Sequence, residues 1–295
     1  MISSVIDIGS NSIKLLIAKG ECATPVFEKL SEIRLSPDTE SARERISENA
    51  FASGVRAVRE LVTIARNFSP VREAIVGTSL FRTAENAEEF ARAVETVTGT
   101  PMRILSEIEE AELIAAGVAT DPAIRPPCAI FDLGGGSLEF IAKNEDTNAD
   151  IFETSWKLGA VRLTRKFIKN PAKPVPEEEI SALRKFVREK IATEISKRLH
   201  PNSQIVFCGG AASICEKLLS EKSTPTLEHL LTKTSTVSLE ERVAFGVPAR
   251  RADIFPAATA TLAEVCALAG SFGFTHTHRN LRYGLCARLN ATPTV

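Results

Sequence analysis

The sequence predicts an α/β fold built from two similar halves that face each other across a cleft. Two short segments of the chain, 3–12 and 128–137, are close copies of one another, and each is followed by an apolar run. Each copy begins as a buried-type strand, ends in an aspartate and passes through a turn of small residues into a second strand. Strands and helices alternate after both copies, which is the pattern of packed α/β layers. A chain of 295 residues is long enough for two domains of ordinary size.

In the first half, β-type runs open the chain as an antiparallel meander, and helices of 3.6-residue period alternate with short strands after it. The expected strands are 5–7, 13–18, 27–35, 74–77 and 102–105, and the expected helices are 50–68, 87–97 and 109–118. The pairs Asp121-Pro122 and Pro126-Pro127 mark a boundary. We therefore expect a first domain over residues 1–122.

The second half repeats this plan. The expected strands are 129–132, 138–143, 151–155 and 205–208, and the expected helices are 176–199, 214–219, 239–245, 251–268 and 281–289. The long helix at 176–199 opens with a proline and three glutamates, which suits the geometry and the dipole of a helix N-terminus. We expect a second domain over 123–280, and a C-terminal helix in 281–295 that packs back on the first domain.

The turns in the two copies are suited to hold phosphate. Glycine at Gly9 and Gly134 lets the backbone turn tightly and approach a ligand, and successive N–H groups in such a turn form an anion-binding nest. An aspartate precedes each turn, Asp7 in the first copy and Asp132 in the second. A carboxylate beside bound phosphate makes sense when a divalent cation lies between them.

The composition of the chain limits the kinds of partner that it can bind. The net charge is −1, so the whole molecule does not attract polyanions, and we expect no nucleic acid polymer as a partner. One local patch is different, because the segment from Lys157 to Val175 has six basic residues and no acidic one. This patch is either a polyanion site or a solvated helix face. No apolar run approaches the length of a membrane helix and no secretory signal is recognisable, so we expect a cytoplasmic protein without membrane contact.

The cysteines and histidines predict neither a metal cluster nor a redox pair. The six cysteines are scattered without C-x-x-C spacing, and we interpret them as buried free thiols. His276 and His278 alternate on an expected strand and so share one face, which we interpret as a surface pair rather than a metal site.

Two further segments lie between the copies. In the first, Thr78, Ser79 and Arg82 follow a strand end, where hydroxyl groups and a guanidinium fork are suitable phosphate ligands. The second, 106–114, has an acidic first helical turn that includes Glu110. Helix capping is the usual role of carboxylates there, so spacing alone leaves a catalytic role open.

Taken together and in order, these motifs resemble those of the exopolyphosphatase / guanosine pentaphosphate phosphatase family. The matching segments are Asp7-x-Gly9-Ser10-Asn11-Ser12, Thr78-Ser79-x-x-Arg82, Glu109-Glu110-Ala111-x-Leu113-Ile114, Asp132-x-Gly134-Gly135-Gly136-Ser137-x-Glu139, 158–163 and 279–285. The resemblance covers nearly the whole chain, and six ordered matches are far more specific than one glycine-rich loop.

The resemblance implies two ribonuclease-H-like domains of the actin/Hsp70-like ATPase superfamily, with the active site in the cleft. It also implies hydrolysis of a terminal phosphoanhydride bond in polyphosphate or in pppGpp with Mg²⁺, or with Mn²⁺ as an alternative. Glu110 matches the general base for the attacking water, and Asp132 and Glu139 match the metal-holding pair, with Asp7 nearby. The phosphate cradle matches Gly9, Ser10, Asn11, Ser12, Thr78, Ser79, Arg82, Gly134, Gly135, Gly136 and Ser137.

Several features depart from the family pattern and leave alternatives open. Lys14 stands where the family usually has arginine, Leu138 replaces a small hydroxyl residue, and the third loop at 209–212 lacks a threonine. The chain lacks the long helical extension of larger members, so short polyphosphate is the expected substrate. A pppGpp phosphohydrolase, a sugar-kinase-like ATPase, and a phosphate or nucleotide sensor remain as alternatives. The oligomeric state is open, with a homodimer as one option.

Overall fold

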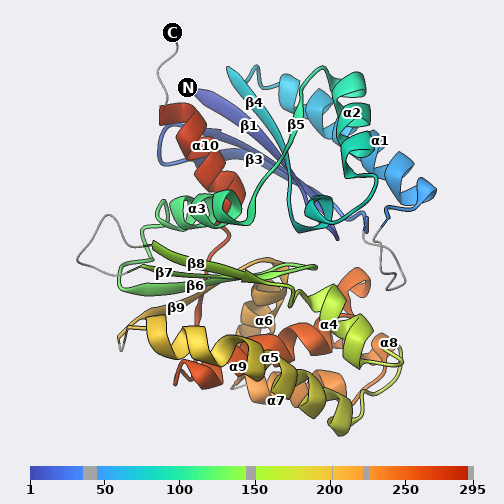
Figure 1. Ribbon diagram of the computed structural model, residues 1–295, viewed down its shortest axis with the longest axis vertical. Coiled ribbons are helices and arrows are strands. Elements are labelled where there is room, and N and C mark those ends of the chain that lie inside the picture. Colours follow the sequence, from blue (N-terminus) through green and yellow to red (C-terminus); the bar gives the residue numbers. More distant parts are fainter. Residues whose placement is uncertain (36–44, 144–150, 201, 222–225, 292–295) are drawn as a thin grey trace. The chain divides into compact units, whose positions relative to one another are not determined.

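The computed structural model describes residues 1–35, 45–143, 151–200, 202–221 and 226–291 (Figure 1). They form two compact units, each with its own hydrophobic core. The first unit comprises Met1–Pro122 and Arg279–Val295, and the second comprises Ala123–His278. The chain therefore builds the second unit as one continuous segment and returns to the first for its last helix.

The first unit contains a five-stranded sheet of order β3-β2-β1-β4-β5. Its strands are β1 (Ile2–Ile8), β2 (Ile13–Lys19), β3 (Thr24–Ser31), β4 (Arg72–Gly77) and β5 (Met102–Ile104). The first three strands are antiparallel, which confirms the predicted meander, and β1, β4 and β5 are parallel. The third strand begins earlier than the predicted 27–35, because the turn after β2 closes at Ala23, whose N–H donates to the Gly20 carbonyl at 3.0 Å.

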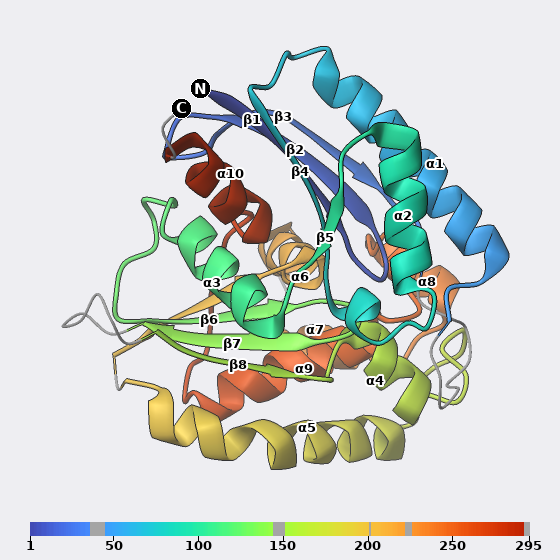
Figure 2. The ribbon, with the colours of Figure 1, turned by 45° about the horizontal axis from the view of Figure 1, so that its top comes forward.

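Helices cover both faces of this sheet (Figure 2). They are α1 (Glu48–Arg66), the 3₁₀ helix η1 (Ser79–Arg82), α2 (Ala87–Thr98), α3 (Glu107–Val118) and α10 (Leu281–Ala291). The helices α1 and α2 lie together on one face, and α3 and α10 pack against each other on the other face. Gly117 and Gly284 allow α3 and α10 to approach each other closely. A Cβ at Gly117 would lie 2.0 Å from the Asn280 carbonyl oxygen, and a Cβ at Gly284 would lie 1.9 Å from the Leu113 carbonyl oxygen.

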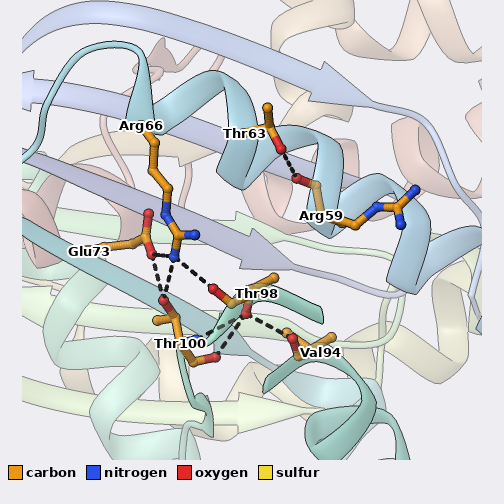
Figure 3. Close-up of polar contacts among 7 residues, drawn as sticks. All are labelled: Arg59, Thr63, Arg66, Glu73, Val94, Thr98 and Thr100. Carbon is orange, nitrogen blue, oxygen red and sulfur yellow. Dashed lines mark hydrogen bonds and ion pairs between the residues drawn. The ribbon is translucent and has the colours of Figure 1, made fainter. Parts of the chain in front are cut away.

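A polar network joins the ends of α1 and α2 to the start of β4 (Figure 3). The Arg66 guanidinium donates to the Glu73 carboxylate at 2.9 Å and to the Thr98 carbonyl at 2.8 Å, and the Thr100 hydroxyl donates to the same carboxylate at 2.5 Å. Glu73 lies at the amino end of β4, whereas Thr78 follows its carboxyl end. The network therefore stabilises the end of the unit opposite the predicted phosphate residues.

The second unit repeats the same sheet, with order β8-β7-β6-β9-β10. Its strands are β6 (Cys128–Leu133), β7 (Leu138–Lys143), β8 (Ile151–Trp156), β9 (Gln204–Cys208) and β10 (Thr275–His276). Its helices are α4 (Ala160–Phe167), α5 (Glu177–Arg198), α6 (Gly210–Glu221), α7 (Leu227–Ser235), α8 (Leu239–Phe245), the 3₁₀ helix η2 (Ala249–Arg251) and α9 (Phe255–Leu268). The repeated order of an antiparallel triplet followed by two parallel strands identifies both units as ribonuclease-H-like, as predicted.

The helix α9 is central to the second unit, because it packs against α4, α5, α6 and α7. It is rich in alanine and is buried along most of its length. The hydroxyl groups of Thr259 and Thr261 are buried without cost, since each donates to the carbonyl four residues earlier, at 3.0 and 2.8 Å. Leu138, which departs from the family pattern, is fully buried in this core.

The sequence did not predict η1, α4 or α7, and the predicted helix at 251–268 begins only at Phe255. The interpretation of the cysteines is confirmed for five of them and is wrong for Cys22, which is exposed. The side chain of His276 is 2% exposed, so its interpretation as a surface residue is wrong. Among the described residues, no helix is long and apolar enough to cross a membrane. A cytoplasmic location and a homodimer stay predictions.

Candidate active site

The turn between β1 and β2 has the predicted tight form. The Gly9 N–H donates to the Ser12 carbonyl at 3.0 Å, and the Ser10 carbonyl accepts from the Leu35 N–H at 2.9 Å. The Asn11 side chain accepts from the Arg34 guanidinium at 3.1 Å. The loop is therefore held by Arg34 and Leu35 as well as by its own turn.

Sheet pairing places the residues after β4 beside this turn. In the parallel register Asp7 is the partner of Val76 and Ile8 is the partner of Gly77, so Thr78 follows directly alongside Gly9. The Thr78 N–H donates to the Ile8 carbonyl at 3.4 Å. Ser79 then begins η1, which ends at Arg82. The first unit thus brings Asp7, the Gly9–Ser12 turn and Thr78 together at the carboxyl ends of adjacent strands.

Two consecutive glutamates in α3 have different roles. Glu109 forms a capping box with Ser106: its N–H donates to the serine hydroxyl at 3.1 Å, and its carboxylate accepts from the Ser106 N–H at 3.0 Å. That backbone hydrogen bond is the main reason why the pKa of Glu109 lies below its usual value. The capping interpretation therefore applies to Glu109 and leaves Glu110 for another role.

Glu110 is buried and is held by an arginine. Its side chain is 10% exposed, and its carboxylate lies 2.6 Å from the Arg82 guanidinium, which also donates to the Leu105 carbonyl at 3.1 Å. The structure therefore joins two residues that the sequence assigned separately to catalysis and to phosphate binding. A charge-assisted bond of this length fixes the orientation of the carboxylate.

The second hairpin repeats the turn of the first. The Gly134 N–H donates to the Ser137 carbonyl at 3.0 Å, as Gly9 does to Ser12. The residues opposite the two aspartates differ, however. In the antiparallel register Asp7 is paired with Lys14, whereas Asp132 is paired with Glu139.

The Asp132–Glu139 pair fits a divalent cation. Residues directly opposite each other on antiparallel strands project from the same face, and two like charges in this position repel each other, which a bound cation would relieve. Glu139 is 2% exposed and its carboxylate accepts from the Ser155 hydroxyl at 3.1 Å. Mg²⁺ commonly takes one or two protein carboxylates and completes its shell with water and phosphate oxygens. Within the described parts of the chain, no group of three or more histidine, cysteine, aspartate and glutamate side chains could hold a metal ion, so Asp7, Asp132 and Glu139 together stay a prediction as a metal-holding set.

The N-terminus of α4 packs directly on the glycine turn of the second unit. The N–H groups of Ala160 and Val161 donate to the carbonyls of Gly134 and Gly135, both at 3.0 Å. A Cβ at Gly159 would lie 2.3 Å from backbone atoms of Gly135 and Gly136, so only glycine fits this contact. The turn is therefore shaped by a helix that the sequence did not predict.

Two arginines outside the predicted set lie at the turns. Arg162 is half-buried, and its Nε donates to the Gly136 carbonyl at 3.3 Å. The guanidinium of Arg251 lies about 2.9 Å from the position of a Cβ on Gly210, in the third loop. Arg162 belongs to the basic segment noted in the sequence. Arg251 follows Pro248 and a second arginine. This local pattern is too common in proteins to indicate a functional residue.

Comparisons with known proteins show which family and fold this chain is similar to. The family model described as the Ppx/GppA phosphatase family matches residues 15–285, which include the second hairpin but not the turn at Gly9–Ser12. An uncharacterized protein of Streptomyces coelicolor is 32% identical over 194 residues, and the match covers 65% of this chain and 57% of that protein.

Two solved structures share the fold over nearly the whole chain. An exopolyphosphatase from Cytophaga hutchinsonii superimposes with a TM-score of 0.86 at 21% identity, covering 98% of each chain. The PPX-GPPA enzyme of Aquifex aeolicus superimposes with a TM-score of 0.77 at 23% identity, covering 98% of this chain and 99% of that one. The family model accounts for more than half of the sequence, and the chain therefore belongs to the Ppx/GppA phosphatase family.

Proposed function

We propose that this chain hydrolyses the terminal phosphoanhydride bond of inorganic polyphosphate, preferably of short chains, and releases orthophosphate. The observation that carries the proposal is the contrast between the two glycine hairpins. Their turns have the same hydrogen bond, but Asp132 opposes Glu139 while Asp7 opposes Lys14. The first turn is thus suited to bind phosphate with its local charge balanced, and the second is suited to bind phosphate together with a cation.

Asp132 and Glu139 would hold Mg²⁺, with Mn²⁺ as an alternative. A bound cation would neutralise charge on the phosphate oxygens and help to orient the terminal group. Asp7 has a supporting role in this proposal. Lys14 is its partner in the strand register, and the positive charge of Lys14 offsets the negative charge of Asp7 that would otherwise attract a second cation.

Glu110 is proposed as the general base. Its carboxylate accepts a proton from the attacking water, whose oxygen forms a bond to the terminal phosphorus as the bridging P–O bond breaks. The shortened chain leaves with the bridging oxygen. Arg82 holds the carboxylate in one orientation, since its guanidinium lies 2.6 Å away. A base so positioned typically contributes 10²–10⁴-fold to the rate.

The basic segment favours polyphosphate over pppGpp. Its four lysines (Lys157, Lys166, Lys169 and Lys173) are exposed, whereas Arg162 and Arg165 are half-buried. Lys166 also lies over the rings of Phe167 and Phe186, with its Nζ 5.8 and 4.8 Å from their centroids. Exposed ammonium groups attract a repeating anion without any base-specific contact. Both substrates end in the same anhydride, so pppGpp remains the second candidate.

One enzyme preparation compared on tripolyphosphate, long-chain polyphosphate and pppGpp tests the proposal. We expect Mg²⁺-dependent release of orthophosphate, fastest from tripolyphosphate, and loss of release on chelation. Glu110→Gln should lower the rate at least about 10²-fold at a temperature where the variant remains folded.

Glu107→Gln is the matched control, because Glu107 is an exposed carboxylate in the first turn of the same helix. It should retain the wild-type rate. Absence of release from all three substrates, or full release by Glu110→Gln, would contradict the proposal. Tight ATP binding with phosphate transfer to a second substrate would instead favour a kinase.

A further inference from the structure

Arg162 holds the glycine turn of the second unit through both its backbone and its side chain. Its N–H donates to the Gly135 carbonyl at 3.3 Å, and its Nε donates to the Gly136 carbonyl, also at 3.3 Å. The first two N–H groups of α4 donate to the carbonyls of Gly134 and Gly135, both at 3.0 Å. Three consecutive carbonyls of the turn are therefore held on the side of α4.

The orientation of these carbonyls decides where the N–H groups of the turn point. The peptide bonds of the turn are trans, and in a trans peptide the carbonyl oxygen and the hydrogen of the following N–H lie on opposite sides of the C–N bond. Because the carbonyls of 134–136 face α4, the N–H groups of Gly135, Gly136 and Ser137 point to the other side of the turn. These three residues belong to the phosphate cradle that the sequence predicted.

The last of these three peptide planes is the one that the Arg162 side chain holds. The turn contains three consecutive glycines, and glycine restricts the rotation of its neighbouring peptide planes least of all residues. The main chain of α4 holds the first two carbonyls, whereas the Gly136 carbonyl accepts from Nε of Arg162. Rotation of this plane would put the Gly136 carbonyl oxygen in place of the Ser137 N–H, and a carbonyl oxygen repels an anion.

We propose that Arg162 is a positioning residue, whose hydrogen bond from Nε to the Gly136 carbonyl keeps the Ser137 N–H directed at a phosphate group bound in the turn. The inference rests on the proposed function, which assigns phosphate to this turn. The role differs from that of the exposed lysines in the same basic segment, because it depends on a donor at Nε and not on the positive charge.

Three substitutions separate the donor from the charge. Arg162→Gln keeps a donor without the charge, because Nε2 of glutamine is as many bonds from the backbone as Nε of arginine. Arg162→Met has a methyl group at that place and no charge. Arg162→Lys has a methylene group there and keeps the charge. A role of the donor predicts that only Arg162→Gln retains function.

The first measurement is calorimetric binding of tripolyphosphate with Mg²⁺, in a Glu110→Gln parent chain in which turnover is expected to be slow. The second is KM and kcat for phosphate release in the wild-type background. Arg162→Met and Arg162→Lys should weaken binding and raise KM about tenfold, because a hydrogen bond from an N–H group to a charged ligand is lost. The contact is already made to bound substrate, so kcat should change less than KM.

Arg162→Gln should bind tripolyphosphate as tightly as the parent chain does. Arg92→Gln is the matched control, because Arg92 is an exposed arginine on α2 whose ion pair with Glu88, at 3.6 Å, lies at the surface. It should also bind as the parent chain does. If Arg162→Met does not fold, the comparison of Arg162→Gln with Arg162→Lys decides.

Two results would overturn the positioning role and leave the proposed function standing. In the first, Arg162→Lys binds more tightly than Arg162→Gln, or folded Arg162→Gln and Arg162→Met weaken binding equally, so that Arg162 acts through its charge. In the second, all three folded variants bind as the parent chain does.

Failure of the proposed function has a different outcome. If the Glu110→Gln chain binds tripolyphosphate but wild type releases no phosphate, the proposed function fails, and the order of binding among the Arg162 variants still decides the positioning role. If the parent chain binds no tripolyphosphate, both are overturned.

Discussion

Replacing Gly159 by alanine isolates the contact between α4 and the glycine turn of the second unit. The backbone at Gly159 has φ −65° and ψ 154°, which any residue adopts, so the substitution introduces no conformational strain. The added Cβ would lie 2.3 Å from the carbonyl carbon and oxygen of Gly135 and from the nitrogen of Gly136. Ordinary contacts between such atoms require the helix and the turn to separate by roughly 1 Å or more.

This displacement bears directly on the proposed phosphate turn. Ala160 and Val161 donate to the carbonyls of Gly134 and Gly135, so the turn cannot stay in place while the helix withdraws. A misplacement of about 1 Å in a catalytic site can cost about 10²-fold in rate, and overpacking of this kind costs about 1–3 kcal/mol of stability. We expect Gly159→Ala to lower phosphate release about 10²-fold at a temperature where the protein remains folded.

The assay is phosphate release from tripolyphosphate, with thermal unfolding measured on the same samples. Gly273→Ala is the matched control, because Gly273 lies in the same unit, has nothing within 4 Å of its Cβ position and has no positive φ. It should leave rate and stability unchanged. A folded Gly159→Ala variant with the wild-type rate would refute the reasoning that α4 shapes the turn.

Three further predictions follow from the buried groups. Arg242 is fully buried and donates to the carbonyls of Pro171, Lys173, Thr234, Val237 and Ala252, so Arg242→Met should lower the free energy of unfolding by about 3–5 kcal/mol in denaturant titrations. Burial lowers the pKa of His276 on folding, so the unfolded chain binds more protons below about pH 6.5 and stability falls as the pH falls through this value. His276→Gln should therefore reduce the loss of thermal stability between about pH 7.5 and pH 5. An undiminished loss would show that the titration of His276 does not contribute to it. All cysteines except Cys22 are buried, and burial raises the pKa of Cys215 and of Cys266 to about 12 and that of Cys286 to about 11. A thiol reagent should therefore label one cysteine rapidly in the native chain, and Cys22→Ser should abolish this reaction.

Much of the fold was predictable because its signals are local. A glycine turn between two apolar runs specifies a hairpin, and both hairpins form as expected, with Asp132 directly opposite Glu139. The helix α7 was also readable, since its buried residues Leu227, Leu230, Leu231 and Thr234 follow the spacing of an amphipathic helix. The local sequence therefore contains enough information to predict α7.

The helix α4 was not readable in the same way. It is short, and Gly159 at its N-cap offers no side-chain hydrogen bond. Its first N–H groups are satisfied instead by carbonyls of the turn at Gly134 and Gly135, which lie some 25 residues earlier in the chain. A helix start that depends on distant carbonyls leaves no capping signal in the local sequence.

The two aspartate–glycine hairpins, the repeated α/β order and the family resemblance could be predicted from the sequence, because strand alternation, turn residues and ordered motifs are properties of neighbouring residues. The partner of each carboxylate came from the packed fold alone. Packing puts Glu109 in the helix cap, pairs Glu110 with Arg82, and brings His276 to Glu216. These assignments depend on burial and on hydrogen bonds between segments far apart in the chain, and such contacts exist only once the elements have packed.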